Sequence, residues 1–162
     1  MSHEIEQVQR FMSTFGQATR LVPQRTITAK ELSLRLRLIQ EELQELFEAC
    51  SPHADGQLVS VDPVAALDAL TDLRYVVYGA FHTFGLAHIA DAAFNEVHRS
   101  NMSKGTVCPE CKGRGGFPTK AADGIEDCVT CNKSGVIATF SESGKILKPA
   151  TYSKPNLEQF IK

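Results

Sequence analysis

The strongest constraint on the fold is the segment 62–85, which predicts one long helix. It opens with Asp62 followed by Pro63, and aspartate caps helix starts while proline fits the first helical position. The glycine at position 85 is typical of a helix end. Between residues 73 and 84 only Arg74 is charged. A helix that is apolar all round is buried on several sides, so the segment indicates a helical bundle or a subunit interface.

Three further helices are predicted around this one. Residues 2–18 carry apolar side chains at helical spacing, with Ser2 placed to cap the first turn. The second helix begins at Thr28 and Glu31, which form the Thr-x-x-Glu pattern of a capping box. A fourth helix spans about residues 86–101. The expected fold class is all-α, with four main helices in a bundle.

The composition changes sharply after this bundle. Residues 105–137 hold six of the eleven glycines and four of the five cysteines, and they show no helical period. The remaining residues form a polar tail. We therefore expect a helical core over residues 1–104, a cysteine-rich insert over 105–137, and a tail over 138–162 that packs on the core.

The insert carries two C-x-x-C pairs separated by sixteen residues, Cys108 with Cys111 and Cys128 with Cys131. This spacing is typical of a four-cysteine zinc site. Four sulfur ligands leave no position for a catalytic water, so the predicted Zn²⁺ is structural. The alternatives are a pair of disulfides or redox dithiols.

The glycines after each pair allow the tight turns of a zinc knuckle. The two units resemble the C-x-x-C-x-G-x-G units of DnaJ-type zinc domains. The second unit departs from that pattern at Lys133, where a glycine is expected.

The charge balance gives no global reason to expect nucleic acid or membrane as a partner. The chain has 17 Lys and Arg against 19 Asp and Glu, and its net charge is -2. The insert is balanced as well, so nucleic-acid binding is not expected. No apolar run reaches the ~20 residues needed to span a bilayer. The first residues lack the pattern of a signal peptide, and we expect a cytoplasmic protein with reduced thiols.

Five carboxylates on the second and third helices are candidate ligands of a divalent cation: Glu41, Glu42, Glu45, Asp68 and Asp72. Residues seven apart share a helix face, and several of these acids continue partly apolar faces in this way. Anionic side chains directed towards a core are costly unless a cation compensates them. Mg²⁺ prefers such oxygen ligands. A solvated acidic surface is the alternative, and spacing alone does not decide between the two.

Four stretches in order resemble the MazG-type, all-α nucleoside triphosphate (NTP) pyrophosphohydrolase superfamily, including its phosphoribosyl-ATP pyrophosphohydrolase-like members from bacteria or phage. The first matches the Glu-Glu-x-x-Glu signature, the second its second metal-binding helix, the third its fourth-helix motif and the last its C-terminal stretch. They are Glu41–Leu46, Asp68–Gly79, Phe94–Lys104, and Ser143–Lys148 with Pro155. Many relatives have Glu-x-x-Asp on the second metal-binding helix. Here the residue three before Asp72 is Ala69, and the acid lies four residues before it, at Asp68, where it could replace the glutamate of the relatives.

The resemblance implies metal-dependent hydrolysis of an NTP between its α and β phosphates, giving the monophosphate and pyrophosphate, with a purine dNTP as a candidate substrate. Mg²⁺ or Mn²⁺ would be held by the five carboxylates, of which Glu41, Glu42, Glu45 and Asp72 are the catalytic candidates. The fourth-helix motif implies that Arg99, Asn101 and Lys104 contact substrate. Their alternatives are solvated basic residues and a helix cap.

A second interpretation is a binding module, in which the zinc insert recognises protein or nucleic acid on a catalytically inactive helical scaffold. Carboxylates on faces that lean inward argue against it. The apolar third helix and the family resemblance both predict a homo-oligomer, a homodimer or a homotetramer. Phe11 and Phe15 are candidates for stacking on a base, with core packing as the alternative.

Overall fold

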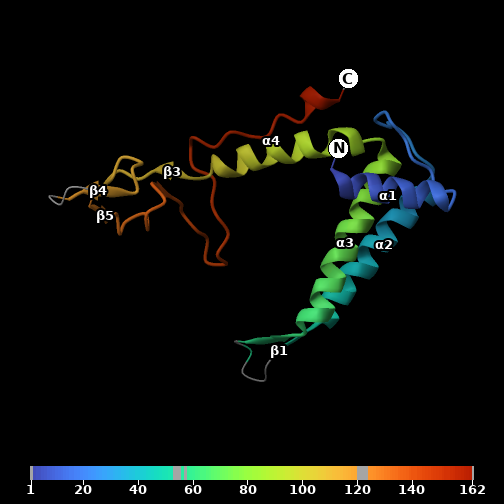
Figure 1. Cartoon of the computed structure of the whole chain (residues 1–162), viewed down its shortest axis with the longest axis horizontal. Helices are drawn as coiled ribbons and strands as arrows, with labels where there is room; N and C mark the ends of the chain where they lie inside the picture. The colour runs from blue at the N-terminus through green and yellow to red at the C-terminus, as the bar shows by residue number, and fades with distance from the viewer. Residues whose placement is uncertain (1, 53–55, 57, 120–123, 162) are drawn as a thin grey trace. The chain divides into compact units, whose positions relative to one another are not determined.

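The computed structural model describes residues 2–52, 56, 58–119 and 124–161 (Figure 1). The chain divides into two compact units, residues 1–91 and 92–162. Within the described residues four α-helices confirm the predicted number: α1 (His3–Thr14), α2 (Ala29–Glu48), α3 (Pro63–Phe84) and α4 (Ala90–Met102). Two short 3-10 helices accompany them, η1 (Ala87–Ile89) and η2 (Glu158–Phe160). Among the described residues, no helix has the length and apolarity needed to cross a bilayer.

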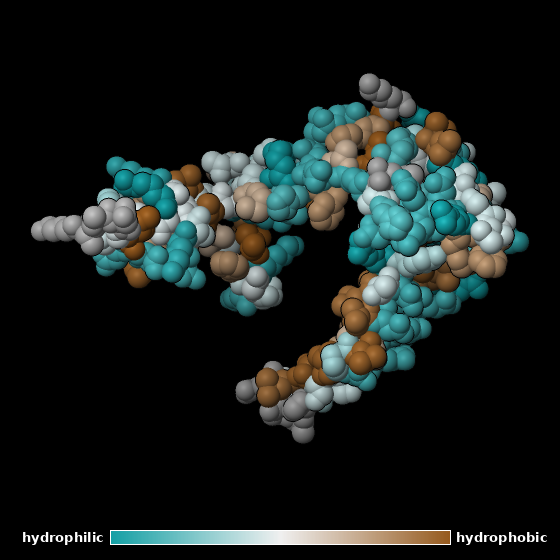
Figure 2. Space-filling model, viewed as in Figure 1, coloured by the Kyte–Doolittle hydropathy of each residue, from teal (hydrophilic) through white to brown (hydrophobic). Residues whose placement is uncertain are grey.

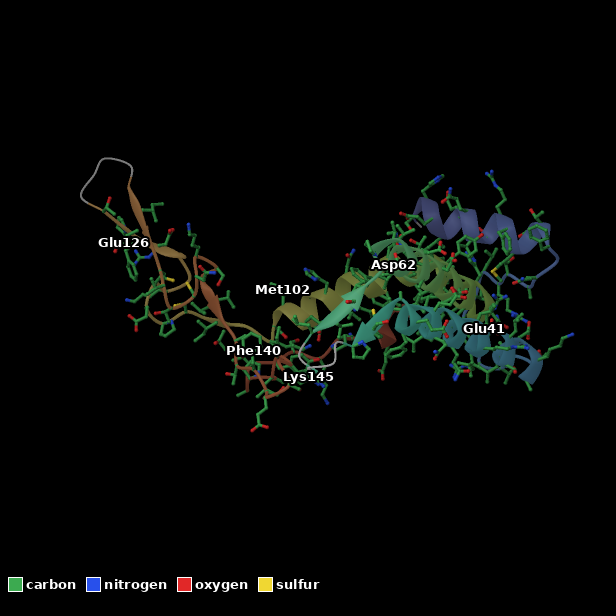
Figure 3. The ribbon with its side chains drawn as sticks, turned by 90° about the horizontal axis from the view of Figure 1, so that it is seen from below. Glu41, Asp62, Met102, Glu126, Phe140 and Lys145 are labelled. Atoms are coloured by element: carbon green, nitrogen blue, oxygen red, sulfur yellow. The ribbon has the colours of Figure 1, made fainter. Side chains whose placement is uncertain are left out.

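In the first unit α2 and α3 pack side by side and α1 packs on α3 (Figure 1). The start of α2 is the predicted capping box, in which Thr28 Oγ1 accepts from the Glu31 amide at 3.2 Å and Glu31 Oε2 accepts from the Thr28 amide at 2.9 Å. Asp62 caps α3 by accepting from Val64 N at 2.9 Å, and it marks the start of that helix in Figure 3. Gly85 ends α3 with a φ of 72°.

The core of this unit is small and lies where α1 meets the C-terminal half of α3. Ile5, Val8 and Met12 are buried there, and the ring of His82 bonds the Ile5 carbonyl at 2.8 Å. Residues 75–84 are all buried or half-buried, as the apolar pattern predicts. The N-terminal half of α3 is open instead: Val64 is 77% exposed and Leu67 67%.

Three features of this unit differ from the sequence prediction. The first helix ends at Thr14, four residues early, and Ser2 lies at its N-cap without making a capping hydrogen bond. An unpredicted pair of short antiparallel strands, β1 (Cys50–Pro52) and β2 (Val59–Val61), follows α2. These strands have only three residues each, which is too short for a two-residue period to be recognised in the sequence.

The second unit holds most of α4, the insert and the tail. Two small antiparallel sheets build the insert: β3 (Thr106–Val107) pairs with β6 (Val136–Ile137), and β4 (Gly116–Pro118) pairs with β5 (Ile125–Asp127). Glu126 lies on β5, and the tail folds back at a bridge between Phe140 and Ile146 (Figure 3). Residues 120–123 of the predicted insert lie outside the described residues.

Candidate active site and metal centre

A pocket of ≈ 340 Å³ lies within the first unit and is lined by matching faces of α2 and α3. On α2 the wall is formed by Arg35, Leu38 and Glu42. On α3 it is formed by four residues that likewise span seven positions: Asp72, Tyr75, Val76 and Gly79. The helices run antiparallel, so a step of seven residues along one matches a step of seven back along the other. The remaining lining residues come from α1 and the chain after it: Val8, Phe11, Met12 and Gln17.

Glu42 and Asp72 form the acidic end of this pocket. Glu42 is half-buried, whereas Asp72, Glu41, Glu45 and Asp68 are exposed. Burial raises the pKa of the Glu42 carboxyl above its ordinary value, and the charges of Glu45, Asp72, Glu41 and Asp68 raise it further. The predicted acids therefore act on one another electrostatically across α2 and α3.

The five predicted carboxylates do not converge on a common point. A metal site needs at least three His, Cys, Asp or Glu side chains whose ligand atoms lie close together. Within the described ranges only one such group is found, the four insert cysteines, whose sulfur atoms all lie within 4.8 Å of one another. The acidic residues nevertheless supply the hard oxygen donors that Mg²⁺ and Mn²⁺ prefer. Their mutual repulsion at Glu42 is the kind of strain that a bound cation relieves.

The opposite end of the pocket is cationic. Arg35 is only 6% exposed, and its Nη2 donates to Oε1 of Gln17. Its Nε has no hydrogen-bond partner among the described residues. A Cβ built on Gly79 would lie 2.9 Å from Arg35 Nη1, so glycine leaves the room that the guanidinium occupies.

Aromatic rings lie between these two ends. The rings of Phe11 and Tyr75 meet edge to face at 5.6 Å, and both residues line the pocket. Phe15 contacts Phe11 at 4.7 Å but is 67% exposed. Of the two phenylalanines considered for base stacking, Phe11 is therefore the one that faces the pocket.

Four of the residues that line the pocket are not predicted from the sequence pattern: Arg35, Gln17, Tyr75 and Gly79. A signal for Arg35 was present, because it precedes Glu42 by seven residues and so shares its helix face. Gln17 lies outside any helix, and no periodicity places it.

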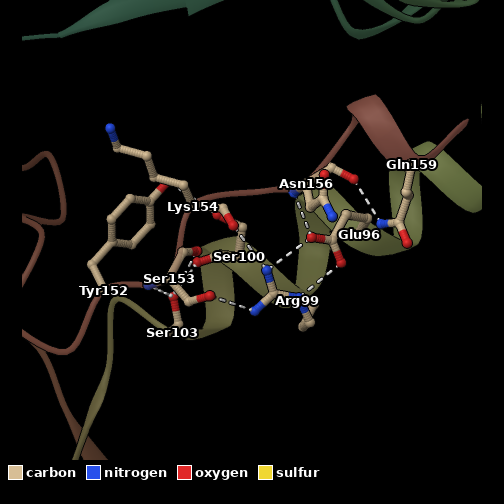
Figure 4. Close-up of polar contacts among 9 residues, drawn as sticks. All are labelled: Glu96, Arg99, Ser100, Ser103, Tyr152, Ser153, Lys154, Asn156 and Gln159. Carbon is tan, nitrogen blue, oxygen red and sulfur yellow. Dashed lines mark hydrogen bonds and ion pairs between the residues drawn. The ribbon is translucent and has the colours of Figure 1, made fainter. Parts of the chain in front are cut away.

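Arg99 lies on α4 and binds the C-terminal tail (Figure 4). Its Nε and Nη2 each donate to a carboxylate oxygen of Glu96 at 2.8 Å, its Nη1 donates to Ser153 Oγ at 3.0 Å, and its Nη2 also donates to the Lys154 carbonyl at 3.0 Å. The backbone amide of Ser153 also donates to Oγ of Ser103 at 2.9 Å. These bonds hold the tail along α4.

The other two predicted substrate residues contact each other, since Lys104 Nζ donates to Asn101 Oδ1 at 2.8 Å. Lys104 also lines a second-unit pocket of ≈ 200 Å³ with Lys148. A role of Arg99, Asn101 and Lys104 towards substrate stays a prediction.

The four predicted zinc ligands do come together. Cys108, Cys111, Cys128 and Cys131 are all buried, and their sulfur atoms lie within 4.8 Å of one another. Burial opposes ionisation of Cys111, but the Gly115 amide and the neighbouring thiols lower its pKa to about 7. Burial raises the pKa of Cys131 to about 12. Four soft, convergent sulfurs fit a tetrahedral metal such as zinc.

The two C-x-x-C turns hold each other in place. The Cys108 amide donates to the Gly135 carbonyl, and the Cys128 amide donates to the Gly115 carbonyl, both at 2.9 Å. Lys133, the departure noted in the sequence, takes a φ of 66° in the left-handed region that normally favours glycine. Its Nζ pairs with Asp127 at 2.8 Å.

Comparison with known proteins adds one finding to this geometry. The sequence model of the family described as phosphoribosyl-ATP pyrophosphohydrolase matches residues 8–101, which is more than half of the chain. The matched range contains the whole ≈ 340 Å³ pocket and stops before the cysteine insert. No curated protein matches the chain.

Proposed function

This chain belongs to the phosphoribosyl-ATP pyrophosphohydrolase family, within the MazG-like all-α superfamily, and from that premise we propose that it hydrolyses a nucleoside triphosphate to the monophosphate and pyrophosphate. The observation that carries the proposal is the pocket in which Glu42 and Asp72 share one end with aromatic rings beside them. Carboxylates at that position suit a cation-bound triphosphate, and the rings suit a base or sugar.

The residues proposed to hold Mg²⁺ or Mn²⁺ are Glu41, Glu42, Glu45, Asp68 and Asp72. A bound cation would neutralise phosphate charge and lower the pKa of a water ligand. The carboxylates orient the attacking water, and one of them accepts its proton as the bond between the α and β phosphates breaks. Asp68 reaches less far than the glutamate that many relatives have near this place, so it ranks last among the proposed ligands.

We propose that the four cysteines hold a structural Zn²⁺. Their sulfurs, with Phe117 and Ile137 packed against them, form the only apolar cluster of the insert within the described residues. Such a small unit depends on its metal for folding. The proposed division into core 1–104, insert 105–137 and tail 138–162 follows from this role.

We also propose that the helical bundle is completed by a second copy of the chain. Apolar residues gather along the side of α3 that leads towards β1 and β2 (Figure 2), and Val64, Leu67 and Leu70 are more than half exposed there. Burying them against another copy would recover about 25 cal/mol for each Å². Light scattering measures the result, and a monomer at micromolar concentration would count against it.

The test of the activity is product analysis on a panel of triphosphates. The eight common NTPs and dNTPs, together with phosphoribosyl-ATP, are incubated with protein and Mg²⁺ and separated by ion-exchange chromatography. The expected products are the monophosphate and pyrophosphate. Release of the diphosphate and inorganic phosphate, or no release from any member of the panel, would overturn the proposal.

A further inference from the structure

The buried guanidinium of Arg35 calls for a partner that the described residues do not supply. Arginine stays charged in proteins, and burying a charge without pairing it is costly. Arg35 is 6% exposed, forms no ion pair with a described carboxylate, and leaves its Nε unbonded. Burial lowers its pKa, and the charge of Glu31 raises it. A buried guanidinium that lines a pocket and lacks an anionic partner among the described residues indicates a ligand with hydrogen-bond acceptors.

The position of Arg35 separates this ligand group from the phosphates. It lies two helical turns from Glu42 on the same face of α2, which is ~10 Å along the axis. Arg35 is absent from the charged groups that shift the pKa of Glu42, as expected for two groups at opposite ends of the pocket. Phosphates held by a cation at Glu42 and Asp72 would occupy the acidic end, which leaves the guanidinium for another part of the ligand. The part of a nucleotide that would reach the guanidinium of Arg35, beyond the rings of Phe11 and Tyr75, is the base, which is the end furthest from the phosphates.

We propose that Arg35 and Gln17 form a base-recognition subsite for a base with adjacent hydrogen-bond acceptors, guanine above all. Guanine presents O6 and N7 side by side, and arginine binds this pair through two parallel donors. Adenine places an amino donor where guanine has O6, so it would face the guanidinium with a second donor. The subsite rests on the proposed function, because it assumes that a nucleotide enters with its phosphates at the acidic end.

Gly79 belongs to this subsite as the residue that positions Arg35. Glycine inside a helix is unfavourable by about 1 kcal/mol relative to alanine. At Gly79 a Cβ would press on Arg35 Nη1 at 2.9 Å. Glycine at this place therefore keeps the guanidinium in the pocket at a cost to the helix.

The experiment compares kcat/KM for dGTP and dATP in the full-length wild-type protein, Arg35→Met and Gly79→Ala. Methionine has a similar length without charge, and replacing a buried charge by an apolar side chain is often neutral for stability. Wild-type protein should favour dGTP by about ten- to hundredfold. Both variants should bring this ratio to within about threefold of one. Gly79→Ala keeps the charge and favours the helix, so it tests the idea even where Arg35→Met does not fold.

Binding of the products dGMP and dAMP, measured by calorimetry, separates this inference from the proposed function. Hydrolysis with equal kcat/KM for both substrates, a preference for dATP or phosphoribosyl-ATP, or a ratio that both folded variants retain would overturn the base subsite and leave the hydrolase standing. Tighter binding of dGMP that Arg35→Met removes, in a protein that hydrolyses no triphosphate, would support the subsite and overturn the hydrolase.

Discussion

Glu31 and Glu42 lie on the same helix, and their surroundings shift their pKa values in opposite directions. Hydrogen bonds from Arg20 and Thr28 lower the pKa of Glu31 from 4.5 to about 2. Burial and four neighbouring acids raise that of Glu42 above 4.5. Ionised Glu31 thus stabilises the fold above pH 4.5 and loses this contribution as the pH falls towards 2. Ionised Glu42 destabilises it, and that cost grows as the pH rises from 4.5 through its folded pKa.

The matching prediction concerns two variants on α2 without divalent metal. At pH 7 Glu31→Gln should be less stable than the wild-type protein and Glu42→Gln more stable. Both differences should shrink as the pH is lowered, the second by pH 4.5 and the first only near pH 2. Urea unfolding followed by circular dichroism measures them. Equal shifts of the two variants in the same direction would contradict the assignment.

A second prediction at the scale of residues concerns activity and again uses Glu42. Glu42→Gln and Asp72→Asn should each lower kcat/KM by about 10²-fold or more, because each removes a charged ligand or a proton acceptor at the acidic end. Glu48→Gln is the control, since Glu48 lies on the same helix but does not line the pocket. Steady-state release of pyrophosphate measures all three, and wild-type rates in Glu42→Gln and Asp72→Asn would show that the metal site is elsewhere.

At this scale the sequence predicts which residue types matter better than where they lie. The four cysteines converge as their spacing indicates, because each C-x-x-C turn sets two sulfurs side by side and backbone hydrogen bonds between the turns join the two pairs. The positions of the acidic residues are harder to predict, since their burial depends on which faces of α2 and α3 meet. Arg35 was overlooked because a charged residue between leucines reads as exposed, whereas only tertiary packing shows that it is buried.

At the scale of elements, two glycine substitutions in the insert test how closely its two C-x-x-C turns pack against each other. Gly113 and Gly115 both have left-handed backbones, with φ of 83° and 77°, so alanine costs each a similar ~1–2 kcal/mol. Only Gly115 lacks space: its Cβ would lie 2.2 Å from the Lys133 carbonyl oxygen, whereas that of Gly113 meets a Val107 methyl at 3.4 Å. Gly115→Ala should therefore lose zinc, and Gly113→Ala should keep it. Metal analysis after gel filtration measures this, and equal zinc in both variants would contradict the packing.

The tail is a second element whose attachment can be tested. Arg99→Ala removes its bonds to Ser153 and Lys154, and charged hydrogen bonds contribute about 1.5–3 kcal/mol each. Trypsin should then cleave after Lys145, which is followed by Ile146, about tenfold faster or more. Arg74→Ala, which breaks an exposed pair with Glu4, is the matched arginine control and should leave this rate unchanged.

Ser103→Ala separates attachment of the tail from substrate binding. It removes the bond between Ser103 and the Ser153 amide without changing Arg99. If Arg99 only holds the tail, both variants should speed cleavage and affect kcat/KM alike. A loss of kcat/KM in Arg99→Ala alone would support the substrate role that the fourth-helix motif implies.

Elements with strong end signals could be predicted from the sequence almost residue by residue. α3 begins at Pro63 and ends before Gly85 because both ends have a cap of their own. α1 was predicted too long, since Phe15 and Ala18 continue the apolar spacing past Thr14. Gly16 is the end signal, because it takes a left-handed φ of 70° and the Gln17 amide then donates to the Met12 carbonyl at 2.8 Å. The β1–β2 pair was missed because its three-residue strands depend on pairing with each other, which a local pattern does not contain.

At the scale of the whole molecule, hard and soft donors are segregated along the chain. The carboxylates lie on α2 and α3 of the first unit, and the cysteines lie in the second. Carboxylate oxygens select Mg²⁺ or Mn²⁺, and thiolates select Zn²⁺. The family match covers only the first set, so the proposed catalytic centre lies inside the matched range and the proposed zinc centre lies outside it.

The last prediction is that the two metals can be removed independently. Mild EDTA should abolish hydrolysis, and Mg²⁺ alone should restore it while zinc stays bound, because four thiolates hold zinc far more tightly than carboxylates hold Mg²⁺. Cys108→Ser should lose zinc and lower the unfolding temperature of the insert, with less than about a tenfold effect on kcat/KM. Activity assays run beside metal analysis of the same samples measure both centres. Loss of all activity in a well-folded Cys108→Ser protein would place zinc in the reaction, because a structural metal acts on turnover only through the fold.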